Sequence, residues 1–135
     1  VTELHKRGIK VIVHLILGLP GETKEMMRAS VSYAAALPVF GMKLQLLHIL
    51  KGTDLHTYYE SHPFDTFTLD DYCDFVTECV ALLPPDIVIH RLTGDGPKKL
   101  LAAPLWSADK KRVLNQLQRT FREKDIWQGK YYPQS

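Results

Sequence analysis

The sequence predicts an α/β fold with about three parallel strands that alternate with helices. The first observation is an apolar run, residues 11–17, which ends at the turn Gly18-Leu19-Pro20-Gly21 and leads into a helical pattern. A run of this kind is typical of a buried parallel strand. The second observation is that the same change, from an apolar run to a helical pattern, occurs twice more. We therefore expect right-handed crossovers and one parallel sheet.

The composition predicts a soluble globular domain. Of the 135 residues, 45% are hydrophobic, and no apolar run is long enough to span a membrane. The 17 basic and 15 acidic residues give a formal net charge of +2, which neither indicates nor excludes a nucleic-acid partner. Cys73 and Cys79 have neither metal-ligand spacing nor the pattern of a disulfide framework. The sequence thus predicts no metal site in this chain and a reducing, cytoplasmic setting.

The first part of the chain is predicted to contain a short helix, a strand and a longer helix. Residues 2–7 look helical and end at Gly8, and a strand over residues 10–17 follows. The second helix, over residues 23–37, carries apolar side chains at helical spacing. A proline directly after it stops this helix.

The middle of the chain repeats the pattern. Residues 42–49 form the second predicted strand, and a short helical turn reaches residue 58. Thr68-Leu69-Asp70-Asp71 has the form of a capping box and opens a helix with one apolar stripe. The pair Pro84-Pro85 ends that helix. The members of the stripe are Leu69, Tyr72, Val76, Cys79, Val80 and Leu83.

The last part of the chain is predicted to hold the third strand and a C-terminal helix. Residues 86–92 form that strand and lead into the loop 93–97, which is rich in glycine. Ser107 is expected to cap the helix. The sequence therefore divides into residues 1–106, with the strands, and a C-terminal helix and tail, residues 107–135.

Three strand exits are predicted to form one surface, because the carboxyl ends of parallel strands lie at the same edge of a sheet. The segments concerned are residues 18–22, 48–54 and 90–97. Each strand also carries a histidine on it or at its end, and these are His14, His48 and His90. No chelating spacing relates the three imidazoles, so they are interpreted as the polar lining of a pocket or as ordinary strand residues.

Polar side chains within the strands are unusual for a sheet that is buried on both faces. Lys43 and Gln45 share a face of the second strand, and Arg91 lies in the third. Such residues cost several kcal/mol unless they are paired or solvated. Two interpretations stay open: an incomplete barrel with a wet interior, or a sheet with one solvated face.

Three segments resemble radical S-adenosylmethionine (radical SAM) enzymes. Residues 13–23, which end in Gly-Leu-Pro-Gly-Glu-Thr, resemble the segment of the fifth strand in that family. Residues 49–55, with a Gly-Thr pair, look like the exit of the sixth strand. Residues 89–97, with Ala103-Pro104-Leu105-Trp106 after them, are similar to the C-terminal region of the bacterial YhcC-type group.

The resemblance implies the C-terminal half of a partial (β/α)6 radical SAM barrel. It also implies a 4Fe-4S cluster and cleavage of S-adenosylmethionine to a 5′-deoxyadenosyl radical. In the family three closely spaced cysteines after the first strand hold the cluster, and this chain has no such motif. The cluster ligands are therefore expected outside this chain, which we expect to be inactive alone.

The resemblance further implies contacts to the adenine of S-adenosylmethionine, while the catalytic residues stay unknown. One set of contacts is Ile16, Gly18, Leu19, Pro20 and Gly21, where glycine leaves room for a flat ligand. The other set is the backbone of His48, Ile49 and Leu50, which leaves the side chains there free to face substrate. His14 stands where the family has glycine. The residues predicted to face substrate are His14, Gln45, His90, Arg91 and Asp95.

The predicted partners are the N-terminal half of the same barrel and an RNA or small-molecule substrate. A half barrel exposes strand edges, through which we expect pairing with the missing half or dimerisation. The alternative function is a non-catalytic α/β module that binds a nucleotide or RNA. The tail mixes cations with aromatic residues, which suits either RNA contact or docking on the barrel. Its members are Arg119, Arg122, Lys124, Trp127, Lys130, Tyr131 and Tyr132.

Overall fold

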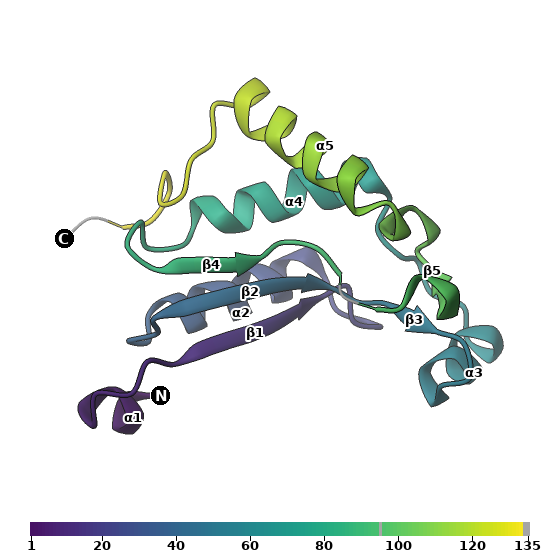
Figure 1. Ribbon diagram of the computed structural model, residues 1–135, viewed down its shortest axis with the longest axis horizontal. Helices are drawn as coiled ribbons and strands as arrows, with labels where there is room; N and C mark the ends of the chain where they lie inside the picture. The colour runs from purple at the N-terminus through teal and green to yellow at the C-terminus, as the bar shows by residue number, and fades with distance from the viewer. Residues whose placement is uncertain (95, 134–135) are drawn as a thin grey trace.

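Three parallel strands form one sheet, as the sequence predicts (Figure 1). Their order in the sheet is β1-β2-β4. They are β1 (Ile12–Leu17), β2 (Gly41–Leu46) and β4 (Val88–Arg91). The computed structural model describes residues 1–94 and 96–133 of the chain. Both outer strands, β1 and β4, have one edge that no strand of the described part covers. Both edges of this sheet are therefore open among the described residues.

Three long helices lie on one side of this sheet (Figure 1). They are α2 (Lys24–Ala35), which connects β1 to β2, α4 (Leu69–Ala81), and α5 (Lys110–Glu123), which packs on α4. A short helix, α1 (Thr2–Lys6), precedes β1. All six side chains of the apolar stripe predicted for α4 are buried. The core between helices and sheet includes Met27, Val31, Leu44, Tyr72, Phe75, Val76 and Leu117.

The cap of α4 agrees with the sequence prediction, and the cap of α5 does not. Thr68 caps α4, because its Oγ1 accepts a hydrogen bond from the Asp71 N–H at 3.1 Å. The prediction that Ser107 caps α5 is wrong. Asp109 is the cap, with its Oδ1 accepting from the Arg112 N–H at 3.1 Å. Ser107 instead lies buried in a short 3-10 helix, η2 (Leu105–Ala108).

A second, two-stranded sheet lies beyond the strand exits. The single strand predicted over residues 42–49 is in fact two, because residues 47 and 48 belong to neither strand. The second piece, β3 (Ile49–Leu50), pairs antiparallel with β5 (Leu101–Ala103), which the sequence analysis did not predict. The helix α3 (Asp54–Ser61) follows β3 and is longer than the predicted turn. Residues 98–100 form the 3-10 helix η1, directly before β5.

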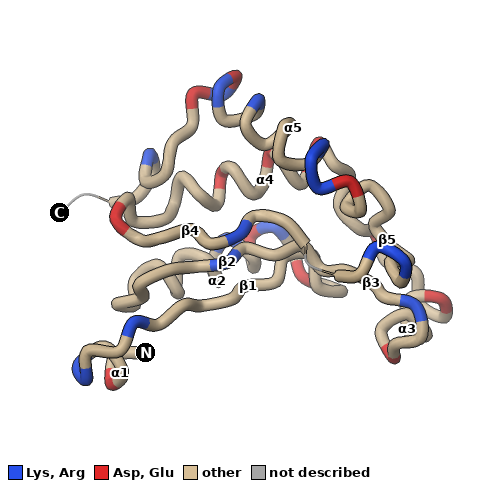
Figure 2. Tube along the Cα trace, viewed as in Figure 1, with Lys and Arg blue, Asp and Glu red and all other residues tan. Residues whose placement is uncertain are grey.

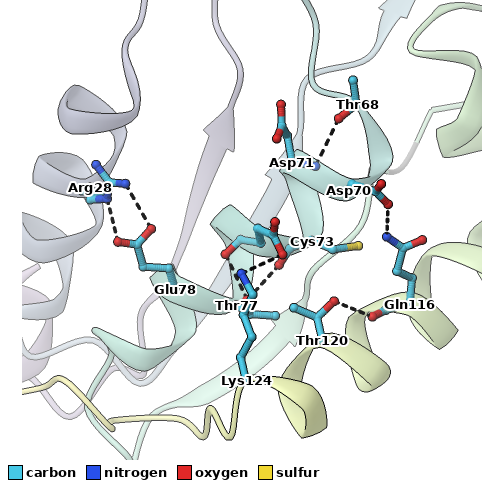
Figure 3. Close-up of polar contacts among 11 residues, drawn as sticks. Arg28, Thr68, Asp70, Asp71, Cys73, Thr77, Glu78, Gln116, Thr120 and Lys124 are labelled. Carbon is cyan, nitrogen blue, oxygen red and sulfur yellow. Dashed lines mark hydrogen bonds and ion pairs between the residues drawn. The ribbon is translucent and has the colours of Figure 1, made fainter.

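Polar contacts join α4 to both neighbouring helices (Figure 3). Arg28 of α2 donates two hydrogen bonds to the Glu78 carboxylate, at 3.0 and 3.1 Å. On the other side, Lys124 forms an ion pair with Asp74 at 2.9 Å, directly after α5. These pairs are partly exposed, so each contributes about 1 kcal/mol or less. They fix the order of the helices more than they stabilise the fold.

The C-terminal tail docks on the end of α4. The Gln128 side chain donates to the carbonyls of Pro84 and Ile87, at 2.7 and 2.9 Å. The Tyr131 N–H donates to the Ala81 carbonyl at 2.8 Å. Lys130 lies over the Trp127 ring, 4.8 Å from its centroid. The tail therefore docks on the rest of the chain, which is one of the two alternatives given for it above. The division of the chain between residues 106 and 107 remains a prediction.

The two faces of the sheet differ sharply. On β2, Met42, Leu44 and Leu46 are buried beneath the helices, whereas Lys43 and Gln45 between them are only half-buried. We call the second face the open face, since α2, α4 and α5 all pack on the other one. Its residues are Ile12, His14, Ile16, Gly41, Lys43, Gln45, Val88 and His90.

Charged residues of both signs lie on most helices and connecting segments (Figure 2). This distribution agrees with a formal net charge of only +2. None of the helices within the described residues has both the length and the apolar character that crossing a membrane requires.

Candidate functional site

The three strand exits come together, as the sequence predicts. The Leu47 N–H donates to the Leu17 carbonyl at 2.9 Å, which joins the first exit to the second. The side chain of His48 then joins the second exit to the loop that follows β4. The carboxyl edge of the sheet is therefore one continuous surface.

The glycine turn after β1 is shaped by protein packing. Gly18 has φ +94°, and a Cβ atom there would lie 3.4 Å from the Phe67 ring. A Cβ atom would fit there in ordinary van der Waals contact, so it is the backbone conformation, which other residues rarely adopt, that favours glycine at this position. Gly21, with φ +75°, has no atom within 4 Å of its Cβ position. Open space therefore lies above Gly21, whereas the Cβ position of Gly18 faces the Phe67 ring.

A cavity of about 330 Å³ lies beside this turn. Gly18, Leu19 and Gly21 line one side of it, and the aromatic rings of Phe64 and Phe67 line the other. Three carboxylates and one ammonium group also line it, and these belong to Glu22, Asp65, Asp71 and Lys24. Aromatic walls beside an exposed backbone turn can hold a flat, apolar ligand.

His48 is held between two segments that are distant in the sequence. Its Nδ1 accepts a hydrogen bond from the Gly96 N–H at 3.0 Å, and its Nε2 lies 2.7 Å from Ser107 Oγ. Because Nδ1 accepts, the neutral imidazole carries its proton on Nε2 and donates to the Ser107 hydroxyl. His48 therefore connects the end of β2 to the loop after β4 and to η2.

The loop after β4 is fitted closely around this imidazole. A Cβ atom at Gly94 would overlap the His48 ring, and one at Gly96 would lie 2.7 Å from Nδ1. The expectation that the side chains of this segment are free to face substrate is therefore wrong for His48. Ile49 is fully buried, and its neighbour Leu50 is half-buried in the pairing with β5. Contacts from their backbone to a cofactor remain a prediction.

Three of the five predicted substrate residues share the open face. His14 lies opposite Lys43 in the β1–β2 register, and Gln45 lies opposite Ile16. The His90 ring lies against the backbone of Gly41, where a Cβ atom would be only 2.7 Å away. Arg91 is half-buried and aligned with Lys43, and Asp95 lies outside the described residues. Lys43, which the sequence analysis noted but did not assign, belongs to the same group.

The cysteines do not fit an iron-sulfur cluster. Both lie fully buried in α4, and burial raises the pKa of Cys73 to about 11 and that of Cys79 to about 12. A cluster ligand must be a thiolate, and these thiols stay protonated at neutral pH. In the part of the chain that the structure describes, no three histidine, cysteine or acidic residues gather as metal ligands. Cys73 and Cys79 are therefore unsuited to hold a cluster.

Comparison with known proteins identifies relatives over nearly the whole chain. Residues 39–123 match the family described as the Radical_SAM C-terminal domain. The uncharacterised protein YtqA of Bacillus subtilis is 39% identical over 132 residues, which cover 98% of this chain and 41% of YtqA. Protein YhcC of Escherichia coli is 31% identical over 121 residues, covering 90% of this chain and 39% of YhcC. The chain thus spans about two fifths of these relatives.

A solved structure has the same fold. The archaeal Elp3 of Methanocaldococcus infernus, with an N-terminal deletion, matches with a TM-score of 0.74 and 16% identity. The match covers 94% of this chain and 30% of that one. At this identity the likeness concerns the fold alone.

Proposed function

Because the chain belongs to the radical SAM family, as its C-terminal domain, we propose that it forms the C-terminal part of a radical SAM enzyme. Such an enzyme cleaves S-adenosylmethionine reductively and uses the resulting 5′-deoxyadenosyl radical on its substrate. The observation that carries the proposal is the family match over residues 39–123. The parallel sheet with all its long helices on one face supports it, because that is the layout of part of a barrel wall.

In this proposal the open face of the sheet lines the interior of the barrel. The N-terminal half of the same protein would pair with a free edge of the sheet and close the barrel. The cluster, with its three cysteines, belongs to that half, since Cys73 and Cys79 are buried and protonated. This chain alone is expected to be inactive.

The residues proposed to contact adenine lie at the carboxyl end of β1. Ile16 is 45% exposed on the open face and offers an apolar surface to a flat ring. Gly18, Leu19, Pro20 and Gly21 would continue that surface, with the Cβ position of Gly18 facing Phe67. The second predicted set of adenine contacts was the backbone of residues 48–50. The backbone of Ile49 and Leu50 remains in the proposal, and the imidazole of His48 serves to hold the neighbouring loop.

The alternative, a non-catalytic module that binds a nucleotide or RNA, has less support. The tail that suggested RNA contact uses Lys124 in an ion pair with Asp74 and Lys130 in a hydrogen bond to the Asp125 carbonyl at 2.7 Å. These cations have structural partners. An RNA or small-molecule substrate, a dimer through the strand edges and a cytoplasmic location remain predictions.

A cysteine placed at Ile16 tests whether the open face holds S-adenosylmethionine. We expect S-adenosylmethionine to slow alkylation of the Ile16→Cys thiol at least about tenfold in the full-length protein, reconstituted anaerobically with iron and sulfide, because a bound adenine removes that position from solvent. The rate is read by mass spectrometry of the peptide that contains residue 16.

The matched control is Tyr33→Cys, on the outer side of α2, where the native side chain is 73% exposed. Its alkylation rate should not respond to S-adenosylmethionine. Equal rates for Ile16→Cys with and without the ligand, at a concentration that saturates binding, would refute the assignment of this face.

A further inference from the structure

Four polar side chains of the open face lack partners among the residues that the structure describes. His14, Lys43, Gln45 and His90 make no side-chain hydrogen bond or ion pair with any residue that the structure describes. Nearby polar groups, in contrast, have hydrogen-bond partners within the chain. His48 bonds to Gly96 and Ser107, and other buried donors at the strand exits are equally satisfied: the Tyr72 hydroxyl bonds to Leu92 and the Trp106 indole to Phe67.

Among the described residues of its strands, the open face carries a lysine and no acidic side chain. Lys43 lies on the central strand, and His14 is its register partner on β1. The sequences of β1, β2 and β4 contain no aspartate or glutamate. Lys43 is half-buried although none of the three long helices packs on this face. The open face is therefore complementary to an anion.

Closing the barrel would take the Lys43 ammonium group out of bulk water, which costs free energy. An ammonium group that is moved out of bulk water needs an anion or several hydrogen-bond acceptors, because desolvation of an unpaired ion is expensive. Lys43 offers three N–H donors, Gln45 two, and a histidine ring at least one. Donors of this kind, at neighbouring positions on two strands, match the oxygens of a carboxylate or a phosphate.

We propose that Lys43, together with His14 and Gln45, binds an anionic group of the substrate, a carboxylate or a phosphate, inside the completed barrel. This inference rests on the proposed function, since it requires the open face to be an interior wall. His14 and Lys43 lie two residues before Ile16 and Gln45 along their strands, which is roughly 7 Å deeper than the proposed adenine wall. His14 and Lys43 are thus separate from the adenine contacts, whereas Gln45, the register partner of Ile16, lies at the border between the two sites.

The test measures binding of inorganic phosphate and acetate to the full-length reconstituted protein. Phosphate is followed by the width of its phosphorus NMR line, and acetate by competition with phosphate. Lys43→Met keeps the length of the side chain and removes its charge, and we expect it to weaken phosphate binding at least about tenfold. Lys43→Arg should stay within about threefold of the native protein, because it keeps the charge.

Two controls keep the outcome interpretable. Lys6→Met, in the exposed helix α1, makes the same change in net charge and should leave phosphate binding unchanged. Lys43→Gln serves as a second charge-removing variant if Lys43→Met fails to fold. Native phosphate binding in both charge-removing variants would overturn the inference.

The carboxylate of S-adenosylmethionine is the other source of an anion, and the same experiment separates it. We expect phosphate to bind equally with and without saturating S-adenosylmethionine. If S-adenosylmethionine displaces phosphate, and Lys43→Met lowers the affinity for S-adenosylmethionine, the assignment to substrate is overturned. Phosphate binding that depends on Lys43, in a protein that does not bind S-adenosylmethionine, would overturn the proposed function and leave the anion site standing.

Discussion

Replacing Leu44 by alanine is expected to lower the free energy of unfolding by about 2–5 kcal/mol. Leu44 lies in the middle of the central strand and is fully buried against the helices. Its removal loses apolar burial and leaves a cavity that α2 and α4 cannot fill without moving. Urea denaturation of this chain, followed by circular dichroism, measures the change.

The adjacent residue provides the matched control. Gln45 points to the open face and makes no side-chain hydrogen bond with any described residue, so Gln45→Ala should change the free energy of unfolding by no more than about 0.5 kcal/mol. Similar losses for the two variants would mean that both faces of β2 are packed, and the open face would not exist.

Replacing His48 by alanine is the second large effect that we expect. The change leaves the Gly96 N–H and the Ser107 hydroxyl without their partner, which costs about 1–3 kcal/mol. Gly94→Ala should cost a similar amount, about 1–3 kcal/mol, because the new Cβ atom overlaps the His48 ring.

The two changes should not be additive. In the double variant the alanine at position 94 no longer meets an imidazole, so its cost in the His48→Ala background should fall below its cost alone. Denaturation of the native chain and the three variants gives this coupling directly. His5→Ala, in the exposed helix α1, is the control and should be close to neutral. Strict additivity would contradict the packing of the loop around His48.

Much of the fold could be predicted because its signals are local. The apolar run before the Gly18 turn, the capping threonine at position 68 and the apolar stripe of α4 each act within a few residues. The small sheet of β3 and β5 gives no such signal. Strands of two and three residues are too short to show a period, and their pairing joins segments about fifty residues apart.

The site was less predictable, because its contacts are long-range. His48 and Ser107 are 59 positions apart, and nothing in the local sequence indicates that they meet. Both Ser107 and Asp109 are good cap residues, and in the structure Asp109 caps α5 while the Ser107 hydroxyl contacts His48. The two glycines after β4 were a usable signal, since a glycine-rich loop often accommodates a neighbouring side chain.

The polar residues within the second predicted strand were the most informative anomaly in the sequence. Lys43 and Gln45 break the pattern of a strand buried on both faces, and the structure shows the reason: the helices pack on one face only. Strand periodicity could predict that the two residues share a face. It could not predict whether that face meets water or the rest of a barrel, because the proposed barrel needs more strands than the three of this sheet.

Anaerobic assay of the full-length protein tests the central claim most directly. The protein is reconstituted with iron and sulfide, supplied with a reductant and S-adenosylmethionine, and analysed for 5′-deoxyadenosine, with the present chain treated identically as the control. We expect the full-length protein to bind a cluster and release 5′-deoxyadenosine, and the chain alone to do neither. A full-length protein that binds the cluster and S-adenosylmethionine yet forms no 5′-deoxyadenosine would contradict the claim.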